Sequence, residues 1–543
     1  MTEVFSVGEP KAIDLSHHLS VIARARRPSP LKDLQRFFGK PGIIAMGGGF
    51  PSPLYFPFAS VSAEGLVPES FPLTPNQTAS SSNSAFSWLW KILGVPTKEK
   101  TTPLTVNKYP DQKDDLNLAT ALQYGLAHGL PQLQKFIEDF GARVYKPASK
   151  DVVYLVHHGN TDGWFKILMT LCNPGEGLLV AEWTYPSAMA CMKPLGIKPV
   201  PLPIDEQGIS SVGLRKVLAE WDEDSQGMAR PHVLYTVPIG QNPTGATMGP
   251  QRKKEIYEIC VEFDVIIVED DPYYFLQLGE YLPKAQRSTN SGRAVSDEEY
   301  LANLTATFLN FDYQGRVIRL DSLSKIIAPG SRLGWFTCNP LFAERLERQA
   351  ETTTQAPCGF GQTMVTSLLL HWKFDGYVRW LRALGAQYTE RRDFLIDCFA
   401  DEFQLEAALE HSGAWKGNTV YRAFSGRGSE KFRIMTEKAH PGVPMFSFVI
   451  PTSGMYIWMQ LHLNHHPAFP DEAPAALEMK LWEQLALAGV LFSPGWMFSA
   501  ETEQEDPVGG GHFRISFSHV SYDAMKGAVV VFGTEVRKFW TQR

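Results

Sequence analysis

Cysteine is scarce and unpatterned in this chain of 543 residues. The six cysteines are scattered, and no two have the C-x-x-C spacing of zinc ribbons and redox motifs. A disulfide framework is not indicated either, because domains that depend on disulfides carry cysteines densely. His462, His465 and His466 lie close together, but the adjacent Pro467 and polar neighbours favour a loop. The sequence therefore predicts no metal site.

Long apolar runs and an excess of basic charge are also missing. No window of about 18 apolar residues exists, so a membrane-spanning helix is not predicted. The N-terminal residues lack the basic and then apolar pattern of a secretory signal. Lys and Arg number 51 against 58 Asp and Glu, a net charge of −7, which disfavours nucleic acid as the main partner. We predict a cytoplasmic protein without a membrane or nucleic-acid partner.

What is present is the composition of a folded protein, since 44% of residues are hydrophobic and 20% are charged. No repeat of 20–50 residues is visible. Three polar stretches, 68–105 with the Ser-rich tract 78–84, 284–299 with 288–292, and 426–430, are predicted to be insertions or loops. They lengthen the chain without adding domains.

The middle of the chain alternates short apolar runs with helical patterns. Strands that are apolar throughout are buried on both faces, which indicates a parallel sheet covered by helices. The apolar runs lie at 152–156, 177–180, 233–237, 265–268 and 317–320, and the clearest helical patterns lie at 161–171 and 250–263.

The C-terminal part reads differently. A helical pattern at 374–399 is followed by short strands at 455–458 and 513–517, with helices at 476–488 and from 522 onward. We predict an α/β fold: a large mixed, mostly parallel sheet sandwiched by helices, with a smaller α+β domain. The predicted limits are 1–125 for an N-terminal arm and segment, 126–373 for the large domain, and 374–543 for the connecting helix and small domain.

Chemically active residues follow four of the predicted strands. In open α/β sheets a ligand binds at the carboxyl ends of the strands, so these segments are expected to meet at one rim. They are His157–Gly163, Gly240–Gly245, Glu269–Tyr274 and Asp321–Lys325.

This set of residues describes a site for pyridoxal phosphate. Lys325, flanked by Ser322 and Ser324, can form a Schiff base beside a phosphate site that Arg332 completes. Asp270 can keep a pyridine nitrogen protonated, which makes the ring an electron sink. Tyr273 can hydrogen-bond the ring oxygen, and the helix that begins at Asn160 and Thr161 offers free N–H groups to a phosphate. Each motif alone has an ordinary explanation as a turn; together, at strand ends, they indicate the cofactor.

These motifs resemble the fold-type I pyridoxal-phosphate aminotransferases, and more narrowly the fungal aromatic amino acid aminotransferases and the kynurenine/2-aminoadipate aminotransferases. The matching pieces span most of the chain. They are Pro28–Leu31, Gly47–Pro53, Leu122–Tyr124, Gly129–Pro131, Gly159–Gly163, Gln241–Gly245, Glu269–Tyr274, Ser322–Lys325 with Arg332, Thr452–Tyr456 and Phe513–Phe517.

The resemblance implies roles at the cofactor. Lys325 is expected to form the Schiff base and then to transfer the proton, while Asp270 pairs with the pyridine nitrogen. Tyr273 and Asn242 are expected at the ring oxygen, and Tyr185 is expected to stack on the ring. The phosphate would be held by Asn160, Thr161, Ser322, Ser324 and Arg332. Relatives often carry Ser-Gln at the first two of these positions, so backbone amides would serve there instead of side chains.

The resemblance also implies a substrate site and a homodimer. Arg514 is expected to clamp the substrate α-carboxylate by a bidentate pair, helped by Asn242 and the backbone near Gly49. Lys32 stands where a relative has an Arg on the substrate side; it can pair with an acid but not as a fork. Tyr124 is expected to reach the cofactor phosphate of the other subunit.

The implied reaction is ping-pong transfer of an amino group from an aromatic L-amino acid to a 2-oxo acid such as 2-oxoglutarate or phenylpyruvate. The resemblance leaves kynurenine and 2-aminoadipate open as further donors. A β-lyase, a C–S lyase or a cyclopropane-carboxylate-synthase-like enzyme on the same scaffold stays open. A cofactor-binding regulator is the remote alternative. Residues 1–45 are too short for a winged helix and show no basic recognition helix.

Overall fold

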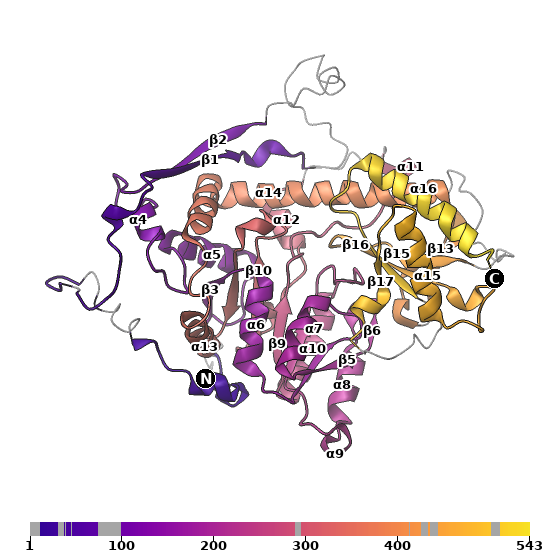
Figure 1. The fold of residues 1–543 in the computed structure, drawn as a ribbon, viewed down its shortest axis with the longest axis horizontal. Coiled ribbons are helices and arrows are strands. Elements are labelled where there is room, and N and C mark those ends of the chain that lie inside the picture. Colours follow the sequence, from indigo (N-terminus) through magenta and orange to yellow (C-terminus); the bar gives the residue numbers. More distant parts are fainter. Residues whose placement is uncertain are drawn as a thin grey trace, which may run out of the picture.

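The computed structural model has two sheet-containing parts that are bridged by one long helix, α14 (Figure 1). Among the described residues, no helix combines the length and the apolar character needed to traverse a bilayer. The structure describes residues 11–30, 37, 40–44, 46–73, 99–287, 295–411, 413–424, 433–434, 444–500 and 511–542.

The larger part is built on a seven-stranded sheet. Its order is β3-β11-β10-β9-β8-β4-β5, and β11 runs antiparallel to both of its neighbours while the other pairings are parallel. The predicted mixed, mostly parallel sheet is therefore confirmed. The strands are β3 (Val153–His157), β4 (Gly177–Ala181), β5 (Lys198–Leu202), β8 (Val233–Thr236), β9 (Ile266–Asp270), β10 (Val317–Ser322) and β11 (Gly334–Cys338).

Alternate residues of these strands pack into two separate cores, one on each face of the sheet. Val233 and Tyr235 belong to one core and Leu234 to the other, as the two-residue period of a strand requires. One face is covered by α6 (Asn160–Leu171), α7 (Pro186–Met192) and α13 (Pro340–Glu351), and the other by α5 (Pro131–Val144), α8 (Ser211–Ala219), α10 (Pro250–Glu262) and the first part of α14.

The smaller part carries its own seven-stranded sheet, in the order β14-β12-β13-β15-β16-β18-β17. All of its pairings are antiparallel except that of β12 with β14. Its elements are β12 (Gln404–Leu409), β13 (Thr419–Phe424), β14 (Arg433–Ile434), β15 (Phe446–Val449), β16 (Tyr456–Leu461), β17 (Ser493–Pro494), β18 (His512–Ser516), α15 (Pro474–Leu487) and α16 (Tyr522–Phe539).

Helix α14 (Gly359–Glu402) lies across both parts (Figure 1). Its helical geometry is interrupted at Lys373, which has φ 56° and ψ −173°. The helix predicted at 374–399 is thus the second half of a longer element, and the break falls at the predicted limit between the large domain and the connecting helix.

One prediction about the polar stretches is wrong in part. The stretch 68–105 was expected to lack regular structure, yet Pro68–Ser70 forms a 3-10 turn and β2 (Thr101–Asn107) is a strand. β2 pairs antiparallel with β1 (Ser60–Leu66), from Ser60 opposite Asn107 to Leu66 opposite Thr101. The tracts 78–84, 288–292 and 426–430 lie outside the described residues.

A cluster of buried charges lies at the carboxyl ends of β9 and β10. Arg319 is fully buried and contacts Glu269 at 3.2 Å, Asp271 at 2.9 Å and Asp321 at 2.9 Å. The guanidinium also lies 4.3 Å from the ring centroid of Tyr145. A buried charge is tolerated when it is paired and hydrogen-bonded, so Arg319 holds three carboxylates inside the sheet, and the buried Lys253 acts electrostatically on two of them, Glu269 and Asp271.

We expect Arg319→Met to lower the free energy of unfolding by about 3–5 kcal/mol, because it leaves three buried carboxylates without their cation. Urea denaturation followed by tryptophan fluorescence measures the loss. The control is Arg215→Met, which breaks a half-exposed pair with Glu262 and should cost less than about 1 kcal/mol. Unpaired buried carboxylates are easier to protonate, so the deficit should shrink as the pH falls. Equal losses in both variants would contradict the assignment.

Candidate active site

The residues predicted at the strand ends meet around one cavity of about 330 Å³ between the two parts of the molecule. Residues of β9 and β10 and the N-terminus of α6 come from the larger part, whereas Tyr456 and Arg514 come from β16 and β18 of the smaller one. The predicted site residues that line it are Asn160, Thr161, Tyr185, Asn242, Asp270, Tyr273, Ser322, Ser324, Lys325, Arg332 and Arg514.

Asp270 is held at the buried end of this cavity. Its Oδ2 accepts a hydrogen bond from the Tyr235 hydroxyl at 2.7 Å, and its Oδ1 accepts one from Asn160 Nδ2 at 2.6 Å. Burial raises the pKa of Asp270, and the hydrogen bonds from Tyr235 and Asn160 oppose that shift. A carboxylate fixed in this way is suited to a cationic partner, such as a protonated ring nitrogen.

Another group of lining residues is suited to accept an anion. Arg332 lies against Gly159, the residue before α6, and its Nη2 donates to the carbonyl of His158 at 2.7 Å. A Cβ at Gly159 would come within 2.5 Å of that nitrogen, so a side chain there would displace the guanidinium. The hydroxyls of Ser322 and Ser324 lie 2.9 Å apart beside it. Hydroxyls, a guanidinium and a helix N-terminus together form a phosphate cradle.

Lys325 lines the same cavity. Burial lowers the pKa of its amino group, and the nearby charge of Arg514 lowers it further. Both effects favour the unprotonated amine, which is the form that attacks a carbonyl carbon.

Arg514 projects from β18 toward the same space. Its Nη1 donates to Asn242 Oδ1 at 2.7 Å and its Nη2 donates to Ser493 Oγ at 3.2 Å. The guanidinium lies 4.2 Å from the ring centroid of Tyr456 and 4.7 Å from that of Phe498. A fork held this way can receive a carboxylate in a bidentate pair beside aromatic surface.

Two further tyrosines complete the lining. The hydroxyl of Tyr273 lies 3.4 Å from that of Tyr456, and burial raises the pKa of Tyr273 well above its usual range. Tyr185 precedes the first residue of α7 and borders the cavity. Sequence reasoning missed Tyr235, although its hydroxyl stands out within an otherwise apolar strand.

Two predicted residues that the structure describes, Tyr124 and Gly49, do not line this cavity. Tyr124 is 59% exposed, and its ring lies in an edge arrangement with that of Phe50, with centroids 6.1 Å apart. Gly49 is exposed on the same N-terminal segment. Lys32 lies outside the described residues. Tyr124 and Gly49 therefore do not contribute to the cavity of their own chain.

The fold and the site define a fold-type I pyridoxal-phosphate aminotransferase. The family model for class I and II aminotransferases matches residues 97–415, and the chain belongs to this family. Its members use pyridoxal 5′-phosphate, as the sequence predicted. The cavity fits that group, because hydroxyls and a guanidinium that can hold a phosphate, a lysine and a buried carboxylate all line it.

Two similar proteins whose names state a substrate, and one similar solved structure, come from fungi. The chain is 33% identical over 527 residues to an aromatic amino acid aminotransferase of Schizosaccharomyces pombe, covering 96% of this chain and 97% of that protein. It is 34% identical over 513 residues to an L-tyrosine:2-oxoglutarate aminotransferase of Serpula lacrymans, covering 92% and 86%. The solved aminotransferase Aro8 of Candida albicans is 32% identical, with a TM-score of 0.80 over 98% of this chain and 100% of that one.

We expect Tyr235→Phe to raise the pKa of Asp270, because it removes a hydrogen bond to the charged form. The value of kcat/KM at neutral pH should fall by about tenfold or more, as for the loss of a hydrogen bond to a charged group. The acid limb of the pH profile should move to higher pH, so activity recovers as the pH rises. Steady-state kinetics across pH measures both effects.

The matched control is Tyr257→Phe. Tyr257 donates to the buried Asp312 at 3.0 Å, a similar pair that does not border the cavity. This variant should leave the pH profile where it is in the wild type. An unchanged profile in Tyr235→Phe as well would show that the hydrogen bond does not act on the reaction.

Proposed function

We propose that this aminotransferase takes the amino group of an aromatic L-amino acid and gives it to a 2-oxo acid, in two half-reactions at one site. The observation that carries the proposal is the convergence of Lys325, Asp270 and the Arg514–Asn242 fork on one cavity. The aromatic donor class is supported by the relatives named above and by the rings of Tyr456 and Phe498 beside the fork.

We assign the protein's part in the reaction to four groups. Bound pyridoxal phosphate supplies an electron sink for the substrate's α-carbon. Arg514 holds the α-carboxylate, and Lys325 both binds the cofactor's carbonyl carbon and moves the α-proton. Asp270 keeps the ring nitrogen protonated, and Tyr273 with Asn242 supports the ring oxygen.

We assign the cofactor phosphate to the hydroxyls, the guanidinium and the helix N-terminus described above. The role of Asn160 differs from the one expected from the sequence. Ser322, Ser324, Arg332 and the amide and hydroxyl of Thr161 are proposed to hold the phosphate, and Tyr185 is proposed to cover the ring. The Asn160 side chain is engaged with Asp270. We therefore propose that Asn160 orients Asp270 and offers only its backbone N–H to the phosphate.

A homodimer is part of the proposal. The N-terminal segment exposes several large apolar side chains, among them Ile44, Met46, Leu54 and Tyr55, which are 72–88% exposed. An apolar surface of this kind favours burial against another chain. A second copy covering it would bring Tyr124 and Gly49 toward the neighbouring site. A cytoplasmic location, the domain limits and the role of Lys32 stay predictions of the sequence.

The donor class is tested by adding L-amino acids to the cofactor-loaded protein without an acceptor. We expect Phe, Tyr and Trp to bleach the visible absorbance band of the bound cofactor and to release the matching 2-oxo acid. Alanine serves as the small apolar comparison and should react more weakly. Release of ammonia and pyruvate from a substrate with a leaving group at Cβ would indicate a lyase and contradict the proposal.

Lys325→Ala should lower the transamination rate by about 10²–10⁴-fold or more, because the nucleophile and the proton-transfer group are lost together. Single-turnover absorbance kinetics with phenylalanine measures the loss. Lys254→Ala, an exposed lysine on α10, is the control and should react at the wild-type rate. A Lys325→Ala protein that transaminates at the wild-type rate would refute the assignment.

A further inference from the structure

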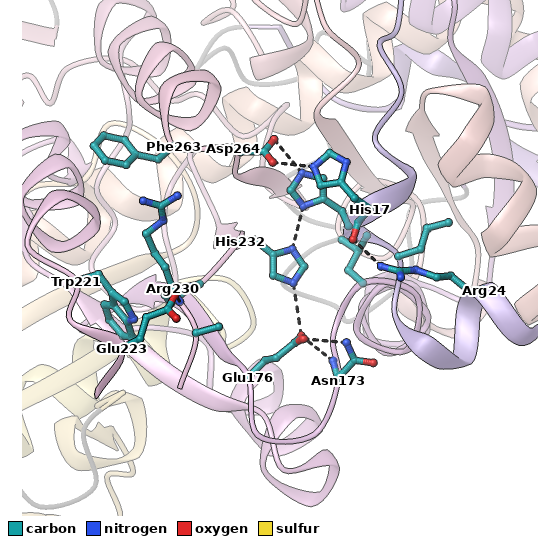
Figure 2. A pocket seen from close by; sticks show the side chains of 15 residues that line it. His17, Arg24, Asn173, Glu176, Trp221, Glu223, Arg230, His232, Phe263 and Asp264 are labelled. Atoms are coloured by element: carbon teal, nitrogen blue, oxygen red, sulfur yellow. Dashed lines mark hydrogen bonds and ion pairs between the residues drawn. The ribbon is translucent and has the colours of Figure 1, made fainter. Parts of the chain in front are cut away.

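A second cavity, of about 480 Å³, shares no lining residue with the active site (Figure 2). The 3-10 turn Ser16–His18 and helix α1 (Val21–Ala25) form one wall of it. The remaining walls come from the ends of α6 and α10 and from the segment before β8. Two histidines of the turn lie against a carboxylate from the larger domain at this place.

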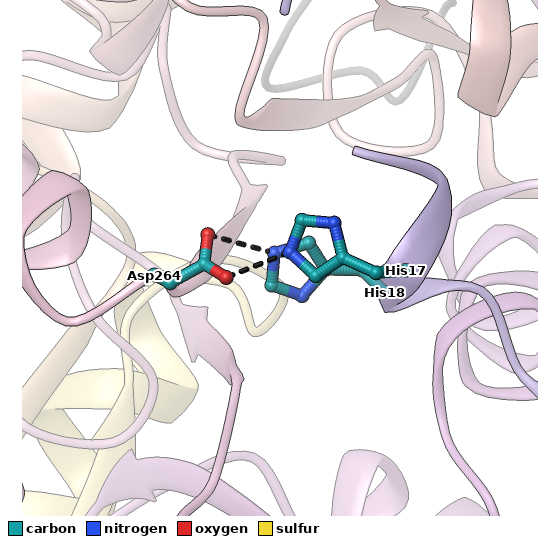
Figure 3. Close-up of side chains that lie close together, drawn as sticks. All are labelled: His17, His18 and Asp264. Atoms are coloured by element: carbon teal, nitrogen blue, oxygen red, sulfur yellow. Dashed lines mark hydrogen bonds and ion pairs between the residues drawn. The ribbon is translucent and has the colours of Figure 1, made fainter. Parts of the chain in front are cut away.

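The carboxylate belongs to Asp264, in the loop that follows α10. His17 Nε2 lies 2.7 Å from its Oδ2, and His18 Nε2 lies 3.1 Å from its Oδ1 (Figure 3). One ligand atom of each residue lies within 4.8 Å of the others. Arg316 Nη1 also binds Oδ1, at 2.7 Å, which leaves Oδ2 turned toward His17.

The hydrogen bonds of this cluster cannot all form if His18 and His232 are both neutral. His18 Nδ1 lies 3.0 Å from His232 Nδ1, and His232 Nε2 lies 3.5 Å from a carboxylate oxygen of Glu176 (Figure 2). Carboxylates only accept hydrogen bonds, so each Nε2 would have to carry its ring's proton. Two lone pairs would then face each other across the Nδ1–Nδ1 contact.

A cation beside His18 Nε2 removes this conflict. The proton of His18 can then lie on Nδ1 and be donated to His232, which in turn donates from Nε2 to Glu176. Glu176 is itself held by the backbone N–H and the side-chain amide of Asn173, both at 2.8 Å. Histidines that bind metals commonly donate their second nitrogen in this manner, and that partner fixes the ring. A proton on His232, whose side chain is 26% exposed and faces Glu176, is the competing explanation, and the binding experiment below separates the two.

We propose that His17 Nε2, His18 Nε2 and Asp264 Oδ2 bind one divalent transition-metal ion such as Zn²⁺, which fastens the N-terminal turn to the larger domain. Two imidazoles and a carboxylate are a ligand set that Zn²⁺ accepts. Zn–N bonds of about 2.0–2.1 Å place tetrahedral ligand atoms about 3.3 Å apart, so a small spreading of these side chains suffices. The cavity lies beside the cluster and admits water to the remaining coordination positions.

The test is equilibrium dialysis of the tag-free, cofactor-loaded protein against ZnCl₂, with CoCl₂ as a spectroscopic probe. We expect one ion to bind per chain. The visible absorption spectrum of bound Co²⁺ should differ from that of the hydrated ion, because imidazole nitrogens replace water as ligands. His17→Ala should weaken binding by at least about tenfold. It should not disturb folding, because the His17 side chain is 58% exposed. Asp264→Asn is the second variant and should weaken binding similarly.

His371→Ala, an exposed histidine on α14, is the matched control and should bind as the wild type does. Equal affinity in His17→Ala and in the control would identify an adventitious surface ion and overturn the proposal. Absence of stoichiometric binding to the wild type would overturn it as well and leave the shared proton as the explanation.

A second readout tests the fastening itself. Zn²⁺ should slow tryptic cleavage after Arg24 and Arg26 severalfold in the wild type, because both follow the anchored turn. It should not slow cleavage in His17→Ala. Cleavage at the same rate with and without Zn²⁺ in the wild type would refute the fastening role.

Discussion

Three consecutive carboxylates, Glu269, Asp270 and Asp271, set the electrostatic condition on which the active site depends. Successive residues of a strand point to opposite faces, so Asp270 faces the cavity while its two neighbours face the core behind the sheet. Burial of Glu269 and Asp271 would be prohibitive without a cation. Arg319, on the neighbouring strand and opposite Glu269, supplies it. Burial raises the pKa of Asp270, and the hydrogen bonds from Tyr235 and Asn160, with a smaller contribution from Arg319, oppose that shift.

The placement of the cavity between two sheet-containing parts separates the tasks of the site. The larger part contributes the anion cradle, the lysine and the buried carboxylate, all at the ends of strands or at a helix N-terminus. The smaller part contributes Arg514, which reaches across to Asn242. In the proposed mechanism, recognition of the substrate carboxylate is therefore coupled to the relative position of the two parts, whereas the contacts to the cofactor that this chain supplies come from the larger part and Asn242.

Much of this arrangement could be predicted from the sequence because strands buried on both faces are apolar throughout. The runs that became β3, β4, β8, β9 and β10 were recognised for that reason. β5 and β11 were missed, since Lys198–Leu202 carries two prolines, which disfavour a strand, and Gly334–Cys338 is short and begins with a glycine. The side-chain direction of Asn160 and the pairing of Tyr235 with Asp270 were also beyond reach, because sheet register sets contacts between residues 35 to 110 positions apart.

The β1–β2 hairpin has a consequence for how this chain can vary in length. Its register holds Leu66 opposite Thr101, so the residues between them leave and re-enter the fold at neighbouring points. The entropy of closing a flexible loop grows slowly with its length, by only about 0.6 kcal/mol for each doubling. The strand pair therefore offers protein engineers a port whose two ends lie side by side, where a grafted peptide or reporter domain adds little closure entropy.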